Sequence, residues 1–445
     1  MGLLKALAYI LEPLLGPAAE SRTLGTFRGR RVVVPLTALR SHAYLVGGTG
    51  TGKSRLLRLL AEQDIAAGHG LCLIDPHGDL CEALVAYLAT LPGGHPALAR
   101  AVLIDPTDRE WAVGFNPLQV PPGDDLYPHV LELLTVFRKL WADAEFRGRL
   151  VAGLAHPEAR AYWQGRFGPL PARTKAEWIE STLNKVSAFV SDPWIRDMVG
   201  QRRSTIDPRQ WMDDGAFVLV NLAKGRLKQN SDLVGALLVA KLQEAALSRV
   251  DLPEGERRPF RLYVDEFQHY ATASFQDILS EARKYALAIV MAHQTLAQLD
   301  RTLQASVLAN AKVQVYFRPS RQDAEVLARQ AFRATGRQVK FQLKRGGLAP
   351  EPRTNPVFVP VGEEMEGYIN LLLDMGARQA LLNVRGAGPP VPFRTADAPD
   401  RPRPTAALRG RLVARVARPR QAVRREITAR TTPVPEPAPE DFWTP

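Results

Sequence analysis

A glycine-rich stretch near the start of the chain constrains the fold more than any other feature. Residues 42–46 before it are apolar and β-prone, and the leucines after it have helical spacing. Glycines let backbone N–H groups close around phosphate oxygens, and a helix N-terminus adds partial positive charge. We expect Lys53 to reach the β- and γ-phosphates of a nucleotide and Ser54 to ligate Mg²⁺. The stretch fits the P-loop pattern G-x-x-x-x-G-K-[ST] with Gly47, Gly48, Thr49, Gly50, Thr51, Gly52, Lys53 and Ser54.

Short apolar runs that alternate with helical segments predict an α/β fold with a mostly parallel sheet and crossover helices. Ligands bind such sheets at the carboxyl ends of the strands. We therefore expect the P-loop, Asp75 and Asp105 at one edge of the sheet. The expected strands are 42–46, 71–75, 101–105, 216–222, 260–264, 286–292 and 312–317.

No apolar strand is evident between residues 126 and 211, where the spacing predicts helices at 131–141, 144–154 and 178–190. This stretch is therefore predicted to be an all-α insertion. The expected organisation is an N-terminal helix with short strands (1–40), a first part of the core (41–124), the helical insertion (125–212), a second part of the core (213–335), a C-terminal extension of the core (336–395) and a basic, Pro- and Arg-rich tail (396–445). We expect this tail to be extended or flexible, apart from a helix at 405–416.

The charge of the chain is uneven. The 445 residues carry a net charge of +12, and residues 401–430 contain ten arginines against one acid. An acidic partner such as nucleic acid is therefore expected, although such a tail can also be a solvated segment. The two cysteines, Cys72 and Cys81, form no disulfide framework or metal pattern, which indicates a reducing cytoplasm. No segment is long and apolar enough to span a bilayer, so any membrane association is expected to go through partners.

Three positions outside the P-loop are candidates for chemistry. The strand 260–264 ends in Asp265 and Glu266, as a Walker B element does, so Asp265 is expected to hold Mg²⁺ and Glu266 to act as general base. Gln294 ends the next strand, which could lie between the P-loop and Walker B strands and bring the amide to the γ-phosphate; a contact with water alone is the alternative. Arg283 could complete the ATP site of a neighbouring subunit, but the residues alone do not distinguish it from other arginines.

The chain resembles the HerA/FtsK superfamily of hexameric DNA-translocating ATPases, especially the conjugative coupling proteins and HerA. Beyond the P-loop, the resemblance rests on motifs spread over residues 25–330, and it continues more loosely to 395. These motifs are Ile74-Asp-Pro-His-Gly-Asp79, Phe115-Asn-Pro-Leu118, Val264-Asp-Glu-Phe267, Ala282-Arg-Lys-Tyr285, Ala292-His-Gln-Thr-Leu-Ala-Gln298 and Asn310-Ala-Lys312 with Tyr316-Phe-Arg318 and Asp323-Ala324.

The resemblance implies a RecA-like core that binds ATP and Mg²⁺ through Lys53 and Ser54, with Asp265 and Glu266 as the Walker B pair and Gln294 as sensor. It places Arg283 where the family carries its trans-acting arginine finger. It also implies a homo-hexamer with DNA in a central channel. Coupling proteins usually carry N-terminal transmembrane helices, which this chain lacks, so we expect a cytoplasmic motor without direct anchoring, or one recruited to the inner face of the membrane by a partner.

We therefore expect an ATP-driven DNA translocase that serves conjugation-like transfer or DNA processing. A nuclease, a relaxosome or a membrane channel is the expected further partner. A secretion-type ATPase that moves protein or powers pilus assembly is the alternative, and a nucleotide-gated DNA-binding scaffold is another. The DNA-gripping residues are expected in the basic turn that contains Lys224, Arg226 and Lys228, where a solvated turn is an equal alternative.

Overall fold

The structure is a computed structural model, and it describes residues 21–116, 161–171, 173–175, 177, 191–271, 274–344, 353–401 and 403–431. The helices expected at 131–141, 144–154 and 178–190, and the one expected within 1–40, lie outside these ranges. Contacts group the chain into two units, which we describe separately. The first unit contains residues 1–103, 208–222 and 232–409, and the second contains 104–207, 223–231 and 410–445.

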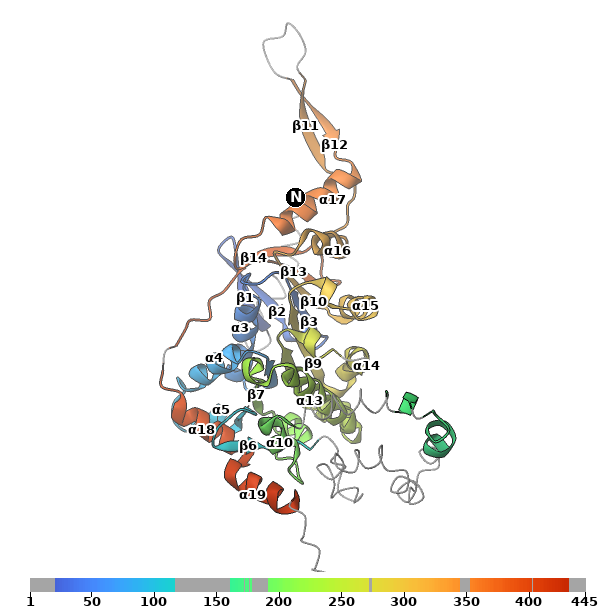
Figure 1. The fold of residues 1–445 in the computed structure, drawn as a ribbon. Coiled ribbons are helices and arrows are strands. Elements are labelled where there is room, and N and C mark those ends of the chain that lie inside the picture. Colours follow the sequence, from blue (N-terminus) through green and yellow to red (C-terminus); the bar gives the residue numbers. More distant parts are fainter. Residues whose placement is uncertain are drawn as a thin grey trace, which may run out of the picture. The chain divides into compact units, whose positions relative to one another are not determined.

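A large mixed sheet forms the centre of the first unit (Figure 1). Eleven strands of the described chain pair in the order β2-β1-β14-β13-β10-β3-β9-β8-β4-β7-β5. Their bounds are β1 Ser21–Phe27, β2 Arg30–Pro35, β3 Ala43–Val46, β4 Gly70–Asp75, β5 Ala101–Ile104, β7 Phe217–Asn221, β8 Phe260–Val264, β9 Leu287–His293, β10 Val313–Phe317, β13 Gln379–Val384 and β14 Val391–Thr395.

The middle of this sheet is parallel, as the sequence predicted. Strands β10, β3, β9, β8, β4 and β7 pair in parallel, and β13, β14, β1 and β2 continue the sheet in antiparallel pairs. Every residue of β3, β4, β8, β9 and β10 is buried, as expected for strands covered by helices on both faces. Strand β9 lies between β3 and β8, which confirms the strand order expected for Gln294.

Helices cover both faces of the sheet. Helices α3 (Lys53–Ala66) and α4 (Asp79–Leu88) lie on one side in Figure 1, and α14 (Ser274–Glu281) and α15 (Arg301–Asn310) lie on the other. Right-handed crossovers produce this division, because β3 to β4 moves along the sheet in the opposite direction to β8 to β9. The other α-helices among the described residues of this unit are α2 Leu36–Leu39, α5 Pro96–Arg100, α11 Pro208–Asp214, α13 Gln229–Leu247 (which begins in the second unit), α16 Arg321–Ala331, α17 Val361–Leu373 and α18 Ala406–Ala414 (which ends in it).

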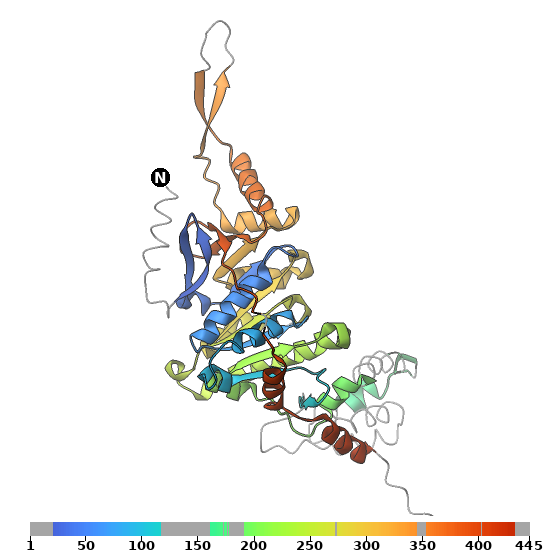
Figure 2. The ribbon, with the colours of Figure 1, turned by 90° about the vertical axis from the view of Figure 1, so that its left-hand side faces the viewer.

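The extension predicted at 336–395 contains a two-stranded hairpin. Strands β11 (Val339–Lys344) and β12 (Arg353–Phe358) pair antiparallel, and the views of Figures 1 and 2 show them projecting from the sheet beside α17. Strands β13 and β14 follow and pair with the edge of the parallel sheet. No helix in the described ranges has the length and apolar character needed to cross a membrane.

The second unit corrects the expectation of a flexible tail. The helix expected at 405–416 is present as α18, but strand β15 (Ala417–Pro419) and helix α19 (Arg420–Thr431) follow it. Strand β15 pairs with β6 (Trp111–Val113), and Val423 and Ile427 of α19 pack on Ala112. Residues 417–431 are therefore folded. The apolar positions that hold α19 are so few among its arginines that the sequence pattern did not reveal them.

Arg420 anchors α19 within this unit. Its guanidinium donates to Asp197 at 2.5 Å and to the carbonyl oxygens of Pro106, Asp108 and Trp111. It also lies 4.5 Å from the ring centre of Trp194. Asp197 belongs to α10 (Pro193–Val199), and both charged side chains are buried. The unit also contains the π-helix Tyr162–Phe167 and the short helix α12 (Lys224–Leu227).

A buried ionic cluster joins the P-loop helix to the Walker B strand. Asp64 of α3 is fully buried and accepts hydrogen bonds from Arg22 of β1 at 2.7 Å, from Tyr263 of β8 at 2.6 Å and from Arg261 of β8. Burial alone would raise the pKa of Asp64, but the charge of Arg261, its hydrogen bond and the charge of Arg22 hold it well below its usual range. The ionised carboxylate therefore fixes α3 against β8 and β1.

We predict that Asp64→Asn lowers the free energy of unfolding at pH 7 by about 3–5 kcal/mol, because it leaves two buried guanidiniums without their counter-charge. The folded-state pKa is depressed, so this contribution is complete above the unfolded-state pKa near 4 and is lost as the pH falls through the folded-state pKa. Denaturant titration should show the gap between wild type and variant narrowing below about pH 4.

The matched control is Asp397→Asn. Asp397 pairs with Arg378 at 2.7 Å, but its side chain is 61% exposed. This variant should change stability by less than about 1 kcal/mol. If the two variants behaved alike at every pH, the cluster around Asp64 would not have the role described.

Candidate nucleotide site

The P-loop connects β3 to α3 in a conformation that depends on glycine. Gly47, Gly50 and Gly52 have positive φ values of 150°, 74° and 118°. A Cβ atom on Gly47 would lie 2.6 Å from Cβ of Phe317, the last residue of β10. The N–H of Gly48 donates to the carbonyl oxygen of Arg318 at 2.9 Å, so β10 supports the loop. The backbone of the P-loop thus lies close to the backbone at the end of β10, and this contact fixes where the loop bends.

Lys53 lies at the first position of α3 and turns back over the loop. Its Nζ donates to the carbonyl oxygens of Gly47 at 2.7 Å and Gly48 at 3.1 Å. Burial lowers the pKa of Lys53, while the nearby carboxylates of Glu266 and Asp265 act to raise it. The ammonium thus stands between the loop and two carboxylates, where the phosphates of a nucleotide would meet it.

Ser54 and Asp265 face each other across the site. The Ser54 hydroxyl donates to Oδ2 of Asp265 at 3.1 Å. Burial raises the pKa of Asp265 to about 6, and the charges of Glu266 and Asp75 add to the increase. The Ser54 hydroxyl and the Asp265 carboxylate are hard oxygen ligands of the kind that suits Mg²⁺. The residues therefore fit the metal expected from the sequence.

Asp75 is the last residue of β4 and holds the start of α4. Its Oδ2 accepts the N–H groups of Leu80 at 2.8 Å and Cys81 at 3.0 Å, and its Oδ1 accepts that of His77 at 3.0 Å. The turn between them needs Gly78, whose φ is 94° and whose Cβ would lie 2.7 Å from the side chain of Asn221. The Asp-Pro-His-Gly motif is thus explained locally as a helix cap at the carboxyl edge of the sheet.

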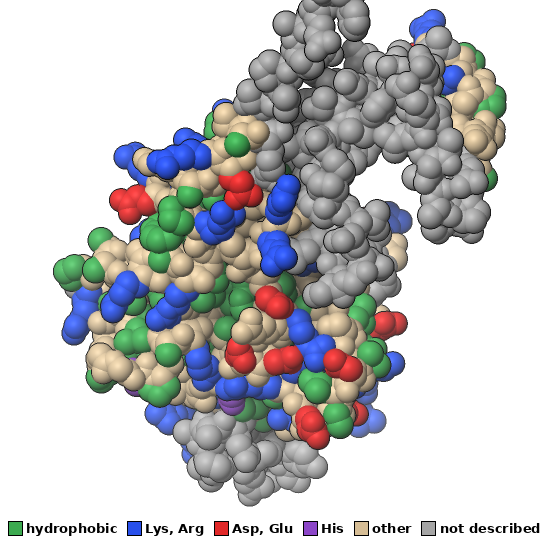
Figure 3. All heavy atoms as spheres, turned by 90° about the horizontal axis from the view of Figure 1, so that it is seen from below, with side chains coloured by type: hydrophobic (Ala, Val, Ile, Leu, Met, Phe, Trp, Pro, Cys, Tyr) green, Lys and Arg blue, Asp and Glu red, His purple; other side chains and the backbone are tan. Residues whose placement is uncertain are grey.

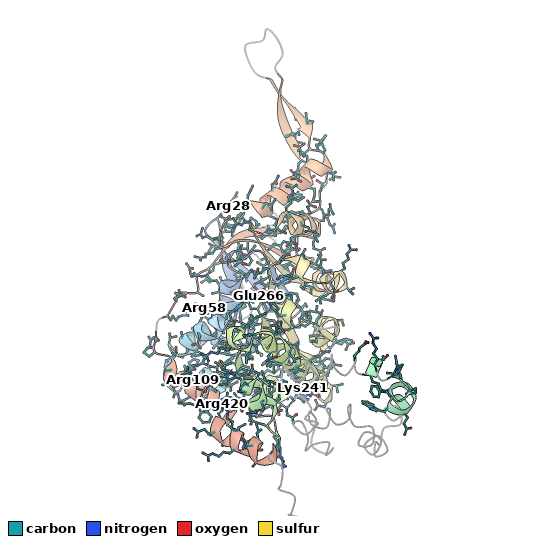
Figure 4. The ribbon with its side chains drawn as sticks, viewed as in Figure 1. Arg28, Arg58, Arg109, Lys241, Glu266 and Arg420 are labelled. Atoms are coloured by element: carbon teal, nitrogen blue, oxygen red, sulfur yellow. The ribbon has the colours of Figure 1, made fainter. Side chains whose placement is uncertain are left out.

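Glu266 and Gln294 contact each other, a contact that the sequence did not predict. The Gln294 amide donates to Oε1 of Glu266 at 2.8 Å, and the Thr49 hydroxyl donates to Oε1 of Gln294 at 3.0 Å. A chain of hydrogen bonds therefore connects the P-loop to the proposed general base. Figure 4 labels this residue, Glu266. Glu266 also has φ of 48°, which is strained for a residue with a side chain.

Sequence reasoning missed Gln268. Its Nε2 donates to Oε2 of Glu266 at 2.7 Å, so both oxygens of this carboxylate accept an amide. Gln268 lies in the 3₁₀ helix Phe267–His269 that follows the Walker B strand. Its position two residues after Glu266 was a signal, but only the left-handed backbone at Glu266 turns the two side chains toward each other.

Arg283 lies at the other end of β9 from Gln294. It belongs to the 3₁₀ helix Ala282–Tyr285 before the strand, and β9 spans about 20 Å. The guanidinium is exposed and borders an open pocket of about 740 Å³. It therefore cannot reach the P-loop of its own chain. The pocket is lined by Thr37, Ser41, Arg283, Ala309, Asn310, Lys312, Arg385 and Gly386.

The basic turn after β7 forms the short helix α12, which contains Lys224 and Arg226, and ends at Lys228 with φ of 52°. Arg226 and Lys228 are exposed, and Arg226 lies 3.4 Å from the carbonyl oxygen of Thr107. Asp105 accepts the N–H of Thr107 at 2.8 Å and its hydroxyl at 2.9 Å. These residues belong to the second unit, and the contacts of Asp105 are those of a turn.

We predict that Gly47→Ala abolishes nucleotide binding, because the added methyl group would collide with Phe317 at a φ that alanine avoids. Binding of a fluorescent ATP analogue measures the effect. Gly93→Ala is the control, since its Cβ meets nothing within 4 Å, and it should bind normally. Normal binding by the Gly47 variant would contradict the described loop conformation.

Two family models match the sequence. The model described as the central domain of helicase HerA matches residues 23–135, and the one described as the TraM recognition site of TraD and TraG matches residues 259–339. The first range contains the P-loop, and the second contains the Walker B pair, Arg283 and Gln294. No curated protein matches the chain as a sequence relative.

Several solved structures have a similar fold. The bacterial conjugative coupling protein TrwBΔN70, in its unbound monoclinic form, is 18% identical with a TM-score of 0.54, over 86% of this chain and 91% of that one. TrwB with the non-hydrolysable ATP analogue ADPNP is 17% identical with a TM-score of 0.53, over 89% and 94%. TrwB with ADP and Mg²⁺ is 17% identical with a TM-score of 0.50, over 84% and 89%.

These structural matches identify the fold as a RecA-like P-loop NTPase core. The two family models support the resemblance noted in the sequence, because one range contains the P-loop and the other contains the Walker B pair. The chain therefore has the fold of a P-loop NTPase, with one region similar to the central domain of helicase HerA and another similar to the TraM recognition site of TraD and TraG.

Proposed function

We propose that the chain hydrolyses ATP at the P-loop and uses the energy to move DNA. The observation that carries this proposal is the hydrogen-bonded connection from Thr49 through Gln294 to Glu266. A nucleotide pocket that only binds needs no carboxylate held beside the position of the γ-phosphate. A hydrolase needs one, because the attacking water must lose a proton.

The residues divide the reaction between them. Lys53 and the loop N–H groups bind the phosphates, and Ser54 and Asp265 would hold Mg²⁺, which offsets phosphate charge when bound. Glu266 accepts the proton of the attacking water, whose oxygen bonds to the γ-phosphorus. The bond from that phosphorus to the bridging oxygen breaks, and its electron pair leaves with ADP. Gln294 touches the γ-phosphate and senses its presence. The TrwB complexes with ADPNP and with ADP and Mg²⁺ support this choice of ligands.

A homo-hexamer is the proposed working form. The guanidinium of Arg283 lies about 20 Å along β9 from its own site, so only a neighbouring subunit could use it. It stands with Lys312 and Arg385 around an open pocket, where phosphate charge from a neighbour would be attracted. Arg283 is therefore proposed to act as an arginine finger in trans.

DNA is the proposed track, held through its phosphates. Lys and Arg side chains are spread over the face drawn in Figure 3, with Asp and Glu side chains among them. A motor that grips phosphates without reading bases needs such cations at its channel. Lys224, Arg226 and Lys228 remain the proposed contacts. The similarity to the TraM recognition site supports a relaxosome component as partner, and recruitment to a membrane channel remains a proposal.

We predict that duplex or single-stranded DNA stimulates ATP hydrolysis, that Lys53→Ala abolishes it and that Glu266→Gln leaves only a small residual rate. Phosphate release with and without DNA measures both effects. Glu266→Gln should still bind nucleotide, because it keeps the loop and lacks only the base. Hydrolysis that no DNA stimulates would favour the secretion-type ATPase, and nucleotide binding with no hydrolysis at all would favour the scaffold.

For the trans arginine we predict that Arg283→Ala and Glu266→Gln subunits, each with little or no activity alone, recover part of the activity when mixed. In mixed rings an intact Glu266 site can meet an intact Arg283 of its neighbour. Exposed Arg301→Ala serves as the matched control and should hydrolyse ATP normally. Failure to recover activity at every mixing ratio, with mixed rings demonstrated by electron microscopy, would argue against a role in trans.

A further inference from the structure

Two side-chain amides on different elements, those of Gln268 and Gln294, donate hydrogen bonds to the carboxylate of Glu266. Gln268 donates to Oε2 at 2.7 Å from the segment that directly follows Glu266, so it moves with the Walker B strand end. Gln294 donates to Oε1 at 2.8 Å from the neighbouring strand, and its own oxygen accepts the hydroxyl of Thr49 in the P-loop. A phosphate bound by the loop therefore competes for Gln294 but not for Gln268.

Of the two polar atoms of the Gln268 side chain, one has a hydrogen-bond partner among the described residues and the other has none. Its Oε1 is buried and has no hydrogen-bond partner among the described residues, while its Nε2 contacts Glu266. Burying an amide oxygen without a partner costs free energy, which an apolar side chain of similar shape would avoid. The amide orientation is set by Glu266, because the opposite orientation would bring two oxygens together.

The backbone supports the same arrangement. Glu266 has φ of 48°, and its N–H donates to Oδ1 of Asp265 at 3.1 Å. This left-handed conformation turns the chain so that Gln268 returns toward Glu266, and it is unfavourable for a residue with a side chain. The strained backbone conformation thus occurs at Glu266, the residue whose carboxylate must be oriented.

We propose that Gln268 is a positioning residue for the general base, an inference that rests on the proposed function. Gln268 keeps its bond to Oε2 of Glu266 throughout the cycle and fixes the plane of the carboxylate. Oε1 accepts the proton from the attacking water after Gln294 leaves it for the γ-phosphate. Gln268 itself touches neither nucleotide nor water.

The test compares Gln268→Met with wild type in the full chain, because methionine has a similar shape and no donor. We expect kcat for ATP hydrolysis to fall by at least ~10-fold, since a carboxylate free to turn spends little time in the productive orientation. KM and the affinity for a fluorescent ATP analogue should stay within about twofold. Gln304→Met on α15 is the matched control and should leave both constants unchanged.

A double variant separates positioning from a general structural role. In Glu266→Gln, which lacks the base, adding Gln268→Met should reduce the residual rate no further, because the two residues act as a unit. A further decrease of about the size seen in wild type would overturn the proposal, as would an unchanged or increased kcat of Gln268→Met alone. A wild-type rate in Glu266→Gln would also overturn the proposal, because it would remove the base that Gln268 positions, whereas a wild-type chain that hydrolysed no ATP would refute the proposed function itself.

Discussion

The parallel pairing of β3, β9 and β8 is the constraint on which the site depends. Each strand ends at the same edge of the sheet, so the P-loop, Gln294 and the Asp265–Glu266 pair meet although more than two hundred residues separate the first from the last. Register matters as much as order. Val46 pairs with His293, and Val264 pairs with Met291, so the residues after these strands begin at nearly the same level. A shift of one residue would turn each side chain to the other face.

The buried ionic cluster around Asp64, in the C-terminal part of the P-loop helix, stabilises this register. It joins the P-loop helix to the Walker B strand through Arg261 and Tyr263, and to the antiparallel edge through Arg22. Such clusters contribute little net free energy, because the desolvation of the ions offsets their attraction. Their effect is specificity, since the two buried guanidiniums need the Asp64 carboxylate of α3 as their counter-charge. The same helix begins with Lys53, so this placement also sets the position of the ammonium.

The two ends of β9 carry two residues, Gln294 and Arg283, that we propose to act in the same reaction. Gln294 faces the chain's own P-loop, and Arg283 stands at the opposite edge beside a basic pocket. A rigid strand of a buried sheet is well suited to connect them. In a ring, phosphate sensed by Gln294 and phosphate contacted by Arg283 would belong to different subunits, so β9 would couple neighbouring sites through one element. Such coupling through β9 is the physical basis on which the subunits of the proposed motor would hydrolyse ATP in sequence.

The sequence alone indicated the nucleotide loop and the Walker B pair, whereas the order of the strands that bring them together came from the structure. These are local patterns: a glycine spacing, and apolar runs that end in carboxylates. Gln268 escaped notice because its contact depends on the left-handed backbone at Glu266, which no propensity indicates. The folded region 417–431 escaped because Arg420 is stable there only through the buried Asp197 and carbonyl groups far away in the chain. Short-range patterns identify which residues can do chemistry, whereas long-range packing alone decides which of them meet and which charges find a buried partner.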